Sequence, residues 1–135
     1  MTRVEAYRFF GTRPKNVYRS LSARSADGRT VAITLWNDKF SGPPGRMAYE
    51  LSGWGDWHRG NCRAFFEDLE HANTHCGGII FVVLVARDRT ALQVQTVDCY
   101  PAKNWAMRIT HLDSASGTFR LEQCALPFAN RPLAA

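Results

Sequence analysis

An amphipathic segment followed directly by an uninterrupted apolar run lies at the centre of this chain. Over 61–76 the apolar residues recur three or four positions apart, which places them on one face of an α-helix. Asn61 is suited to cap the start of this helix, and Gly77 and Gly78 are suited to end it in a left-handed conformation. Residues 79–86 are all apolar, which indicates a strand buried on both faces. We therefore expect the helix to pack on this strand and the rest of the chain to close around the pair.

Two runs of alternating polar and apolar residues flank an Asp-Gly pair in the first third of the chain. The runs cover 17–24 and 30–36, with Asp27 and Gly28 between them, and this arrangement is a strong short-range signal for a β-hairpin. We expect an apolar face that joins the core and carries Val17, Leu21, Ala23, Val31, Ile33 and Leu35. The opposite face would be polar and accessible, with Tyr18, Ser20, Ser22, Arg24, Thr30, Thr34 and Trp36.

The remaining chain supplies further strands and one long connection. Alternating runs at 92–99, 105–112 and 118–124 predict strands, whereas residues 1–16 fit either a short helix or an edge strand. Residues 38–60 combine a Gly-Pro-Pro-Gly run with two tryptophans, and this composition favours a long, ordered functional loop.

These elements together predict the fold class. With 135 residues, the chain fits one domain over 1–135 with a single core, and residues 125–135 form an irregular tail. We expect an α+β domain whose curved, mainly antiparallel sheet or small barrel has about six strands. The helix over 61–76 would be its one principal helix.

Positive charge is concentrated in the N-terminal segment. Residues 1–29 hold seven basic and two acidic side chains, and this excess equals the net charge of +5 of the whole chain. Arginine outnumbers lysine 14 to 3, and its planar guanidinium suits phosphate groups and guanine edges. A solvated basic face, or a genome that favours arginine codons, would give the same composition. We favour a polyanionic partner such as nucleic acid.

Several classes of protein lack their sequence signals here. The apolar run is shorter than the roughly 20 residues that a membrane helix needs. Residues 1–15 have no signal-peptide core, so we expect a cytoplasmic protein that does not meet a membrane. His71 and His75 lie one helical turn apart, but a zinc site needs further ligands. No C-x-x-C pair, nucleophile elbow or phosphate-binding loop is present. We therefore expect no metal, no cofactor and no catalytic residues.

The pattern that remains is typical of a binding surface. Aromatic side chains interleaved with arginine suit base stacking and phosphate contact. Trp36 and Tyr18 would equally fit a packed cross-strand pair. The candidate nucleic-acid contacts are Arg13, Lys15, Asn16, Tyr18, Arg19, Ser22, Arg24, Trp36, Trp54, Trp57, His58, Arg59 and Asn61.

The run from Tyr18 to Asp38 resembles the N-terminal, DNA-reading parts of bacterial HNH-type restriction proteins. The resemblance covers about 20 of the 135 residues, and His111 lacks the partner motif of an HNH nuclease. The shared signature, S-A-x-x-x-D-G-x-x-V-x-x-T-L-W-x-D, falls at Ser22, Ala23, Asp27, Gly28, Val31, Thr34, Leu35, Trp36 and Asp38. Such parts are often compact β-barrel modules similar to modified-base readers. The resemblance implies a reader of duplex DNA, with a modified base as a further expectation, that acts without a cutter or beside a separate nuclease.

Two other functions stay open. Tryptophans are frequent hot spots of protein interfaces, so Trp54 and Trp57 would serve an interaction or inhibitor protein that docks on a host protein. A small-ligand enzyme would instead use His58 as a general base, with Asp56 or Asn61 orienting it, in a pocket between the 38–60 loop and the sheet.

Overall fold

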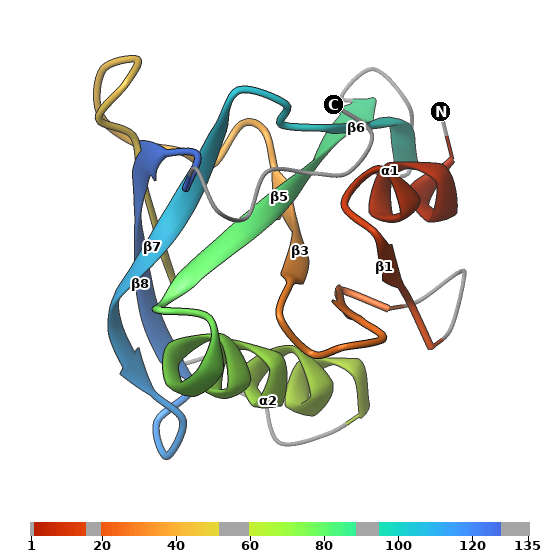
Figure 1. The fold of residues 1–135 in the computed structure, drawn as a ribbon. Helices are drawn as coiled ribbons and strands as arrows, with labels where there is room; N and C mark the ends of the chain where they lie inside the picture. The colour runs from red at the N-terminus through yellow and green to blue at the C-terminus, as the bar shows by residue number, and fades with distance from the viewer. Residues whose placement is uncertain (1, 16–19, 52–59, 89–94, 128–135) are drawn as a thin grey trace.

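The computed structural model describes residues 2–15, 20–51, 60–88 and 95–127, which form a single α+β domain (Figure 1). These residues contain two helices and eight strands, and the strands form one open, curved, mostly antiparallel sheet. The elements in chain order are α1 (Arg3–Phe9), β1 (Thr12–Arg13), β2 (Ser22–Ser25), β3 (Val31–Trp36), β4 (Ala48–Leu51), α2 (Gly60–His75), β5 (Ile79–Asp88), β6 (Gln95–Pro101), β7 (Trp105–Asp113) and β8 (Thr118–Ala125).

Strand β5 is the centre of the sheet, as its apolar sequence predicts. It pairs in parallel with β3 on one edge and antiparallel with β6 and β7, one after the other, on the other edge. The strand order is β1-β2-β3-β5-β7-β8-β4, and β6, which is not part of this order, pairs with β5. Parallel strands need a long crossover connection, which usually contains a helix. The chain between β3 and β5 contains α2 and so provides such a crossover.

The two faces of β5 enter separate parts of the core. Ile80 and Val82 pack with apolar side chains of α2, whereas Phe81, Val83 and Val85 pack with those of α1. Figure 1 shows the two helices on different sides of this central strand. The uninterrupted apolar run therefore reflects burial on both faces, which confirms the prediction for this strand.

Helix α2 confirms the predicted principal helix with small shifts at its ends. It begins at Gly60, so Asn61 lies inside its first turn rather than at the cap. It stops at the glycine pair, where Gly77 and Gly78 have φ of 64° and 75°. Gly78 N donates a hydrogen bond to Ala72 O at 3.0 Å. Glycine adopts this left-handed conformation without the steric cost of a Cβ atom.

Two details differ from the prediction, and a third decides between its alternatives. The sheet is open rather than a closed barrel, because its path ends at β1 on one side and β4 on the other. Residues 3–9, which fit either a helix or a strand, form a helix whose capping box joins Thr2 and Glu5. The 38–60 segment is not a loop throughout, since β4 lies within it and pairs with β8.

Within the described residues, we find no helix that combines the length and the apolar character needed to cross a bilayer.

Candidate functional site

The β2–β3 hairpin forms around the predicted turn, but its two faces are not the predicted ones. Ser22 pairs with Ile33 and Arg24 with Val31. Residues opposite each other in an antiparallel pair point to the same side of the sheet. Ser22 and Arg24 therefore point to the face covered by α2, where Val31 and Ile33 enter the core. The prediction that these polar side chains lie on the face away from Val31 and Ile33 is wrong.

The position of the turn explains this difference. It is centred between Asp27 and Gly28, and Ser25 N donates to Thr30 O at 2.9 Å across the loop. Each even-numbered residue of β2 consequently lies opposite an odd-numbered residue of β3. The alternating pattern of one strand is shifted by one position against that of the other. A face that is apolar on β3 thus continues as a polar face on β2.

The opposite face of the hairpin is covered by α1. The hydroxyl groups of Tyr7 and Thr34 share a hydrogen bond, and burial raises the pKa of the Tyr7 phenol well above its usual range. Ala23 and Ala32 are buried in the same cluster, and Trp36 packs against it partly buried. Trp36 therefore has a packing role, and its contact with nucleic acid stays a prediction.

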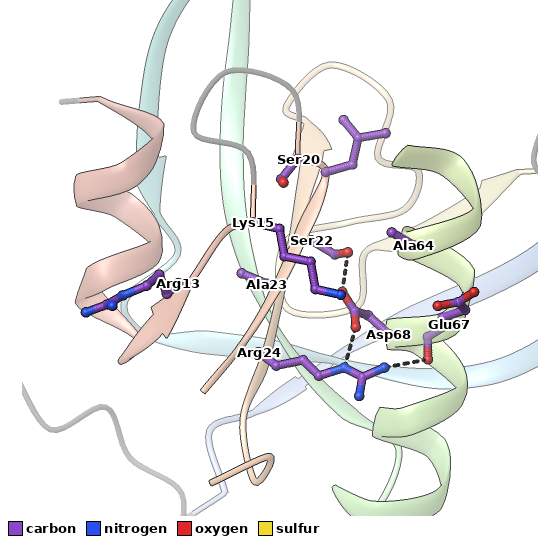
Figure 2. Close-up of a pocket in the computed structure, with 10 residues that line it drawn as sticks. Arg13, Lys15, Ser20, Ser22, Ala23, Arg24, Ala64, Glu67 and Asp68 are labelled. Carbon is purple, nitrogen blue, oxygen red and sulfur yellow. Dashed lines mark hydrogen bonds and ion pairs between the residues drawn. The ribbon is translucent and has the colours of Figure 1, made fainter. Parts of the chain in front are cut away.

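A pocket of about 460 Å³ lies between β2 and α2 (Figure 2). Its lining contains three bases, Arg13 of β1, Lys15 just after it and Arg24 of β2. The facing wall from α2 contributes two acids, Glu67 and Asp68. The structure thus brings together the predicted contacts Arg13, Lys15, Ser22 and Arg24 in one pocket.

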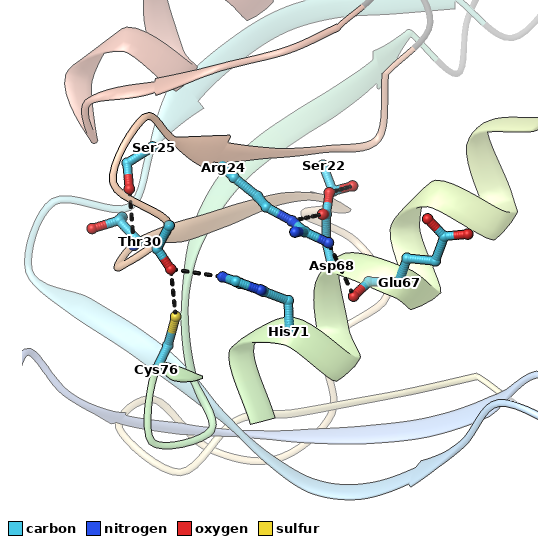
Figure 3. A network of polar contacts seen from close by, with 9 residues as sticks. Ser22, Arg24, Ser25, Thr30, Glu67, Asp68, His71 and Cys76 are labelled. Atoms are coloured by element: carbon cyan, nitrogen blue, oxygen red, sulfur yellow. Dashed lines mark hydrogen bonds and ion pairs between the residues drawn. The ribbon is translucent and has the colours of Figure 1, made fainter. Parts of the chain in front are cut away.

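The polar groups of this pocket form a network around Asp68 (Figure 3). Ser22 Oγ donates to Asp68 Oδ2 at 2.5 Å, and Arg24 Nε donates to Asp68 Oδ1 at 2.5 Å. Arg24 Nη2 also reaches the Glu67 carbonyl oxygen at 3.5 Å. The Asp68 side chain is 13% exposed and that of Arg24 is 41% exposed. A largely buried carboxylate is therefore compensated on both of its oxygens, as burial of a charge requires.

The charges of the wall are balanced within α2 and β2. The Glu67 carboxylate accepts from Arg63 Nε at 3.0 Å, one helical turn earlier, and Asp68 pairs with Arg24. Arg13 and Lys15 are both exposed at the pocket. With both acids paired, these two bases give the pocket a positive balance.

The hairpin turn is also attached to α2, farther along the same helix. His71 Nε2 lies 2.7 Å from Gly28 O, and Cys76 Sγ lies 3.6 Å from the same oxygen (Figure 3). A carbonyl oxygen only accepts, so both side chains act as donors. Burial raises the pKa of the Cys76 thiol, which keeps its proton in place. His71 therefore has a structural partner, and no group of three or more metal-ligating side chains gathers in the described residues.

A second pocket, of about 190 Å³, shares Leu21 with the first. It lies between the 38–51 segment and the sheet, where a small-ligand enzyme would need its active site. Its described lining is mainly aromatic and aliphatic, and Arg3 and Lys39 are its charged members. No acid or histidine belongs to that described lining, and His58, the general base that the enzyme alternative requires, lies outside the described residues.

Several predicted contacts lie outside the described residues. These are Asn16, Tyr18, Arg19, Trp54, Trp57, His58 and Arg59. Asn61 lies in the first turn of α2, with its side chain outside the described part. The interface and enzyme alternatives that rest on Trp54, Trp57 and His58 are thus untested.

Sequence reasoning missed Asp68, the residue around which the pocket is organised. One signal was available, because Asp68 directly precedes the buried Leu69 and lies at the border of the apolar face of α2. An acid at such a border is partly withdrawn from water and needs a partner. Its partners are 44 and 46 residues away in sequence, so only the folded chain identifies them.

No protein-family model, no curated protein and no solved structure matches the chain, so the pocket is interpreted from its own chemistry.

Proposed function

We propose that this chain binds nucleic acid, with duplex DNA as the preferred partner, at the basic side of the pocket between β2 and α2. The observation that carries the proposal is the convergence of Arg13, Lys15 and Arg24 on one pocket. Phosphate contacts from arginine and lysine supply most of the affinity of non-specific DNA binding. The faint likeness to DNA-reading parts of restriction proteins agrees with this proposal, and a modified base is the further expectation that it adds.

Position on the sheet supports the accessibility of these bases. β1 is the last strand on its side of the sheet. Arg13, within β1, and Lys15, just after it, are both exposed. A phosphate backbone could therefore approach them from solvent without moving the core. We expect the protein to act in the cytoplasm without catalysis of its own, as a reader or as the partner of a separate nuclease.

One other explanation accounts for the same bases. Exposed charges on an edge strand also prevent unwanted pairing with other chains. Under that explanation the bases would not bind nucleic acid with a salt-dependent affinity. A measurement of nucleic-acid binding at several salt concentrations therefore separates the two explanations.

The test is a fluorescence anisotropy titration of labelled duplexes at several salt concentrations. Plain, methylated and hydroxymethylated duplexes of the same sequence separate general binding from base reading, and a matched RNA duplex tests the preference for DNA. We expect micromolar or tighter binding at about 50 mM salt, because even non-specific binders reach that range. The absence of binding to every duplex at that salt would refute the proposal.

Variants connect the binding to this pocket. Binding should depend less steeply on salt in Arg13→Ala and in Lys15→Ala. In each variant the magnitude of the negative slope of log K against log salt should decrease by about 1. Arg46→Ala is the matched control, since Arg46 is exposed in the connection before β4, the strand at the other end of the sheet. An equal loss in all three variants would place the binding elsewhere.

A further inference from the structure

We propose that Asp68 competes with phosphate for Arg24, so that the free protein keeps part of its phosphate-binding capacity in an internal ion pair. This inference rests on the proposed function and adds a mechanism by which the same pocket limits its own affinity.

Asp68 occupies one edge of the Arg24 guanidinium. Arg24 contacts Asp68 through Nε at 2.5 Å and the Glu67 carbonyl through Nη2 at 3.5 Å. Nε and Nη2 form one side of the guanidinium fork, with which arginine binds a carboxylate or a phosphate in a bidentate manner. Figure 2 shows this side turned toward α2. One edge with which Arg24 would hold a phosphate is therefore already used within the protein.

The two partners of this ion pair differ in exposure. The Asp68 side chain is 13% exposed, whereas that of Arg24 is 41% exposed and lines the pocket. The guanidinium of Arg24 is therefore accessible to an incoming phosphate, whereas the carboxylate of Asp68 is largely shielded from water. Arg13 and Lys15 line the same pocket and would attract that phosphate.

Asp68 keeps a second hydrogen-bond partner after Arg24 has moved. Ser22 Oγ, which is buried, still donates to Asp68 Oδ2 and holds the carboxylate in place. The carboxylate then remains close to the bound phosphate and repels it. The ion pair in the free protein and the repulsion in the complex both reduce what Arg24 contributes to phosphate binding. Removing the charge of Asp68 should therefore strengthen binding.

The test compares the wild type with Asp68→Asn by anisotropy titration of the same plain duplex over a salt series. Asparagine keeps the size of the side chain and an oxygen for Ser22, and it lacks the charge that holds Arg24. We expect about tenfold tighter binding at low salt, the range of one charge-assisted contact. The salt slope should steepen by about 1, for one additional phosphate contact.

Two controls assign the gain to Arg24. Glu70→Gln removes the same charge from an exposed position on α2 outside the pocket lining, so it reports the general effect of net charge and should leave the slope unchanged. In the double variant Arg24→Gln with Asp68→Asn, the gain should disappear. Circular dichroism melts of all variants confirm that binding is measured on folded protein.

The outcomes separate this inference from the proposed function. Weaker binding by Asp68→Asn would show that Asp68 instead orients Arg24 for phosphate, and unchanged binding would show that Arg24 takes no part; either result overturns the inference while wild-type binding stands. If neither protein binds any duplex, the proposed function fails and the inference fails with it.

Discussion

Helix α2 meets the rest of the protein along two flanks of different chemistry. On one flank, Phe65, Phe66 and Leu69 pack into the apolar cluster that includes residues of β3, β5, β7 and β8. On the other flank, Asp68 and His71 meet β2 and its turn through hydrogen bonds. The helix is therefore held to β3, β5, β7 and β8 by apolar burial and to β2 and its turn by polar contacts.

The difference between these flanks shows how one helix can both stabilise the fold and line a pocket. Truncating a buried leucine or phenylalanine costs about 2–5 kcal/mol, whereas a hydrogen bond contributes a net of about 0.5–1.5 kcal/mol, or about 1.5–3 kcal/mol where a partner is charged, as at Asp68. The polar flank can therefore exchange partners while the apolar flank keeps the helix in place. The four predictions below test this comparison.

The largest effect is expected on the apolar flank. Leu69→Ala should lower the free energy of unfolding by about 2–5 kcal/mol, because Leu69 is fully buried and its truncation leaves a cavity. Urea denaturation followed by circular dichroism measures the change. Asn73→Ala, on the exposed side of the same helix, should stay within about 0.5 kcal/mol. Similar losses in both variants would contradict the division into two flanks.

A smaller effect is expected at the turn that the polar flank holds. Gly28 has a φ of 72°, and a Cβ atom there would lie 3.4 Å from His71 Nε2. Gly28→Ala should cost about 1–2 kcal/mol from backbone strain. Gly11→Ala is a matched control, since Gly11 has a φ of 73° and nothing within 4 Å of such a Cβ. The two variants should agree in thermal melts, and a much larger loss at Gly28 would mean that the His71 contact is more important than one hydrogen bond.

The shared acceptor on the polar flank gives the third prediction. His71→Ala should cost about 0.5–1.5 kcal/mol, because one donor to Gly28 O is lost. Cys76 also donates to that oxygen, so in the double variant with Cys76→Ala the loss should exceed the sum of the single losses. Strict additivity in denaturant unfolding would show that the two contacts do not share this acceptor in solution.

The smallest effect is expected on acidification of the exposed turn. Ser25 Oγ at 2.6 Å and Arg29 N at 3.0 Å donate to the Asp27 carboxylate and hold its pKa below its usual value. A lowered folded-state pKa gives stability that is present above the unfolded pKa and is lost as pH falls through the folded pKa. Asp27→Asn should therefore lose less stability than wild type between neutral pH and pH 3. Parallel losses in thermal melts over that range would remove Asp27 from the acid response.

Much of the fold could be predicted from local patterns. The period of α2, the glycine pair after it and the apolar run of β5 each describe a local environment, and each was found as predicted. The pairing partners of β5 could not be predicted, because parallel pairing with β3 depends on how the intervening chain returns. Closure into a barrel was equally undetermined, since it depends on whether β1 and β4 meet.

The candidate site was predicted only in part. Charge and position identified Arg13, Lys15 and Arg24 as accessible bases, and the structure places them at one pocket. The acidic wall was missed, and the hairpin face was assigned to the wrong side. Both errors have one origin, because the pairing register decides which side of the sheet each β2 residue faces.

The sequence by itself determined helix α2, the central strand β5 and where the positive charge lies, since these follow from side-chain period, glycine positions and composition. Only the tertiary structure decided that Arg24 pairs with Asp68. The physical reason is that period and propensity act over a few neighbouring residues, whereas an ion pair between residues 44 positions apart depends on strand register and on how α2 packs across the sheet.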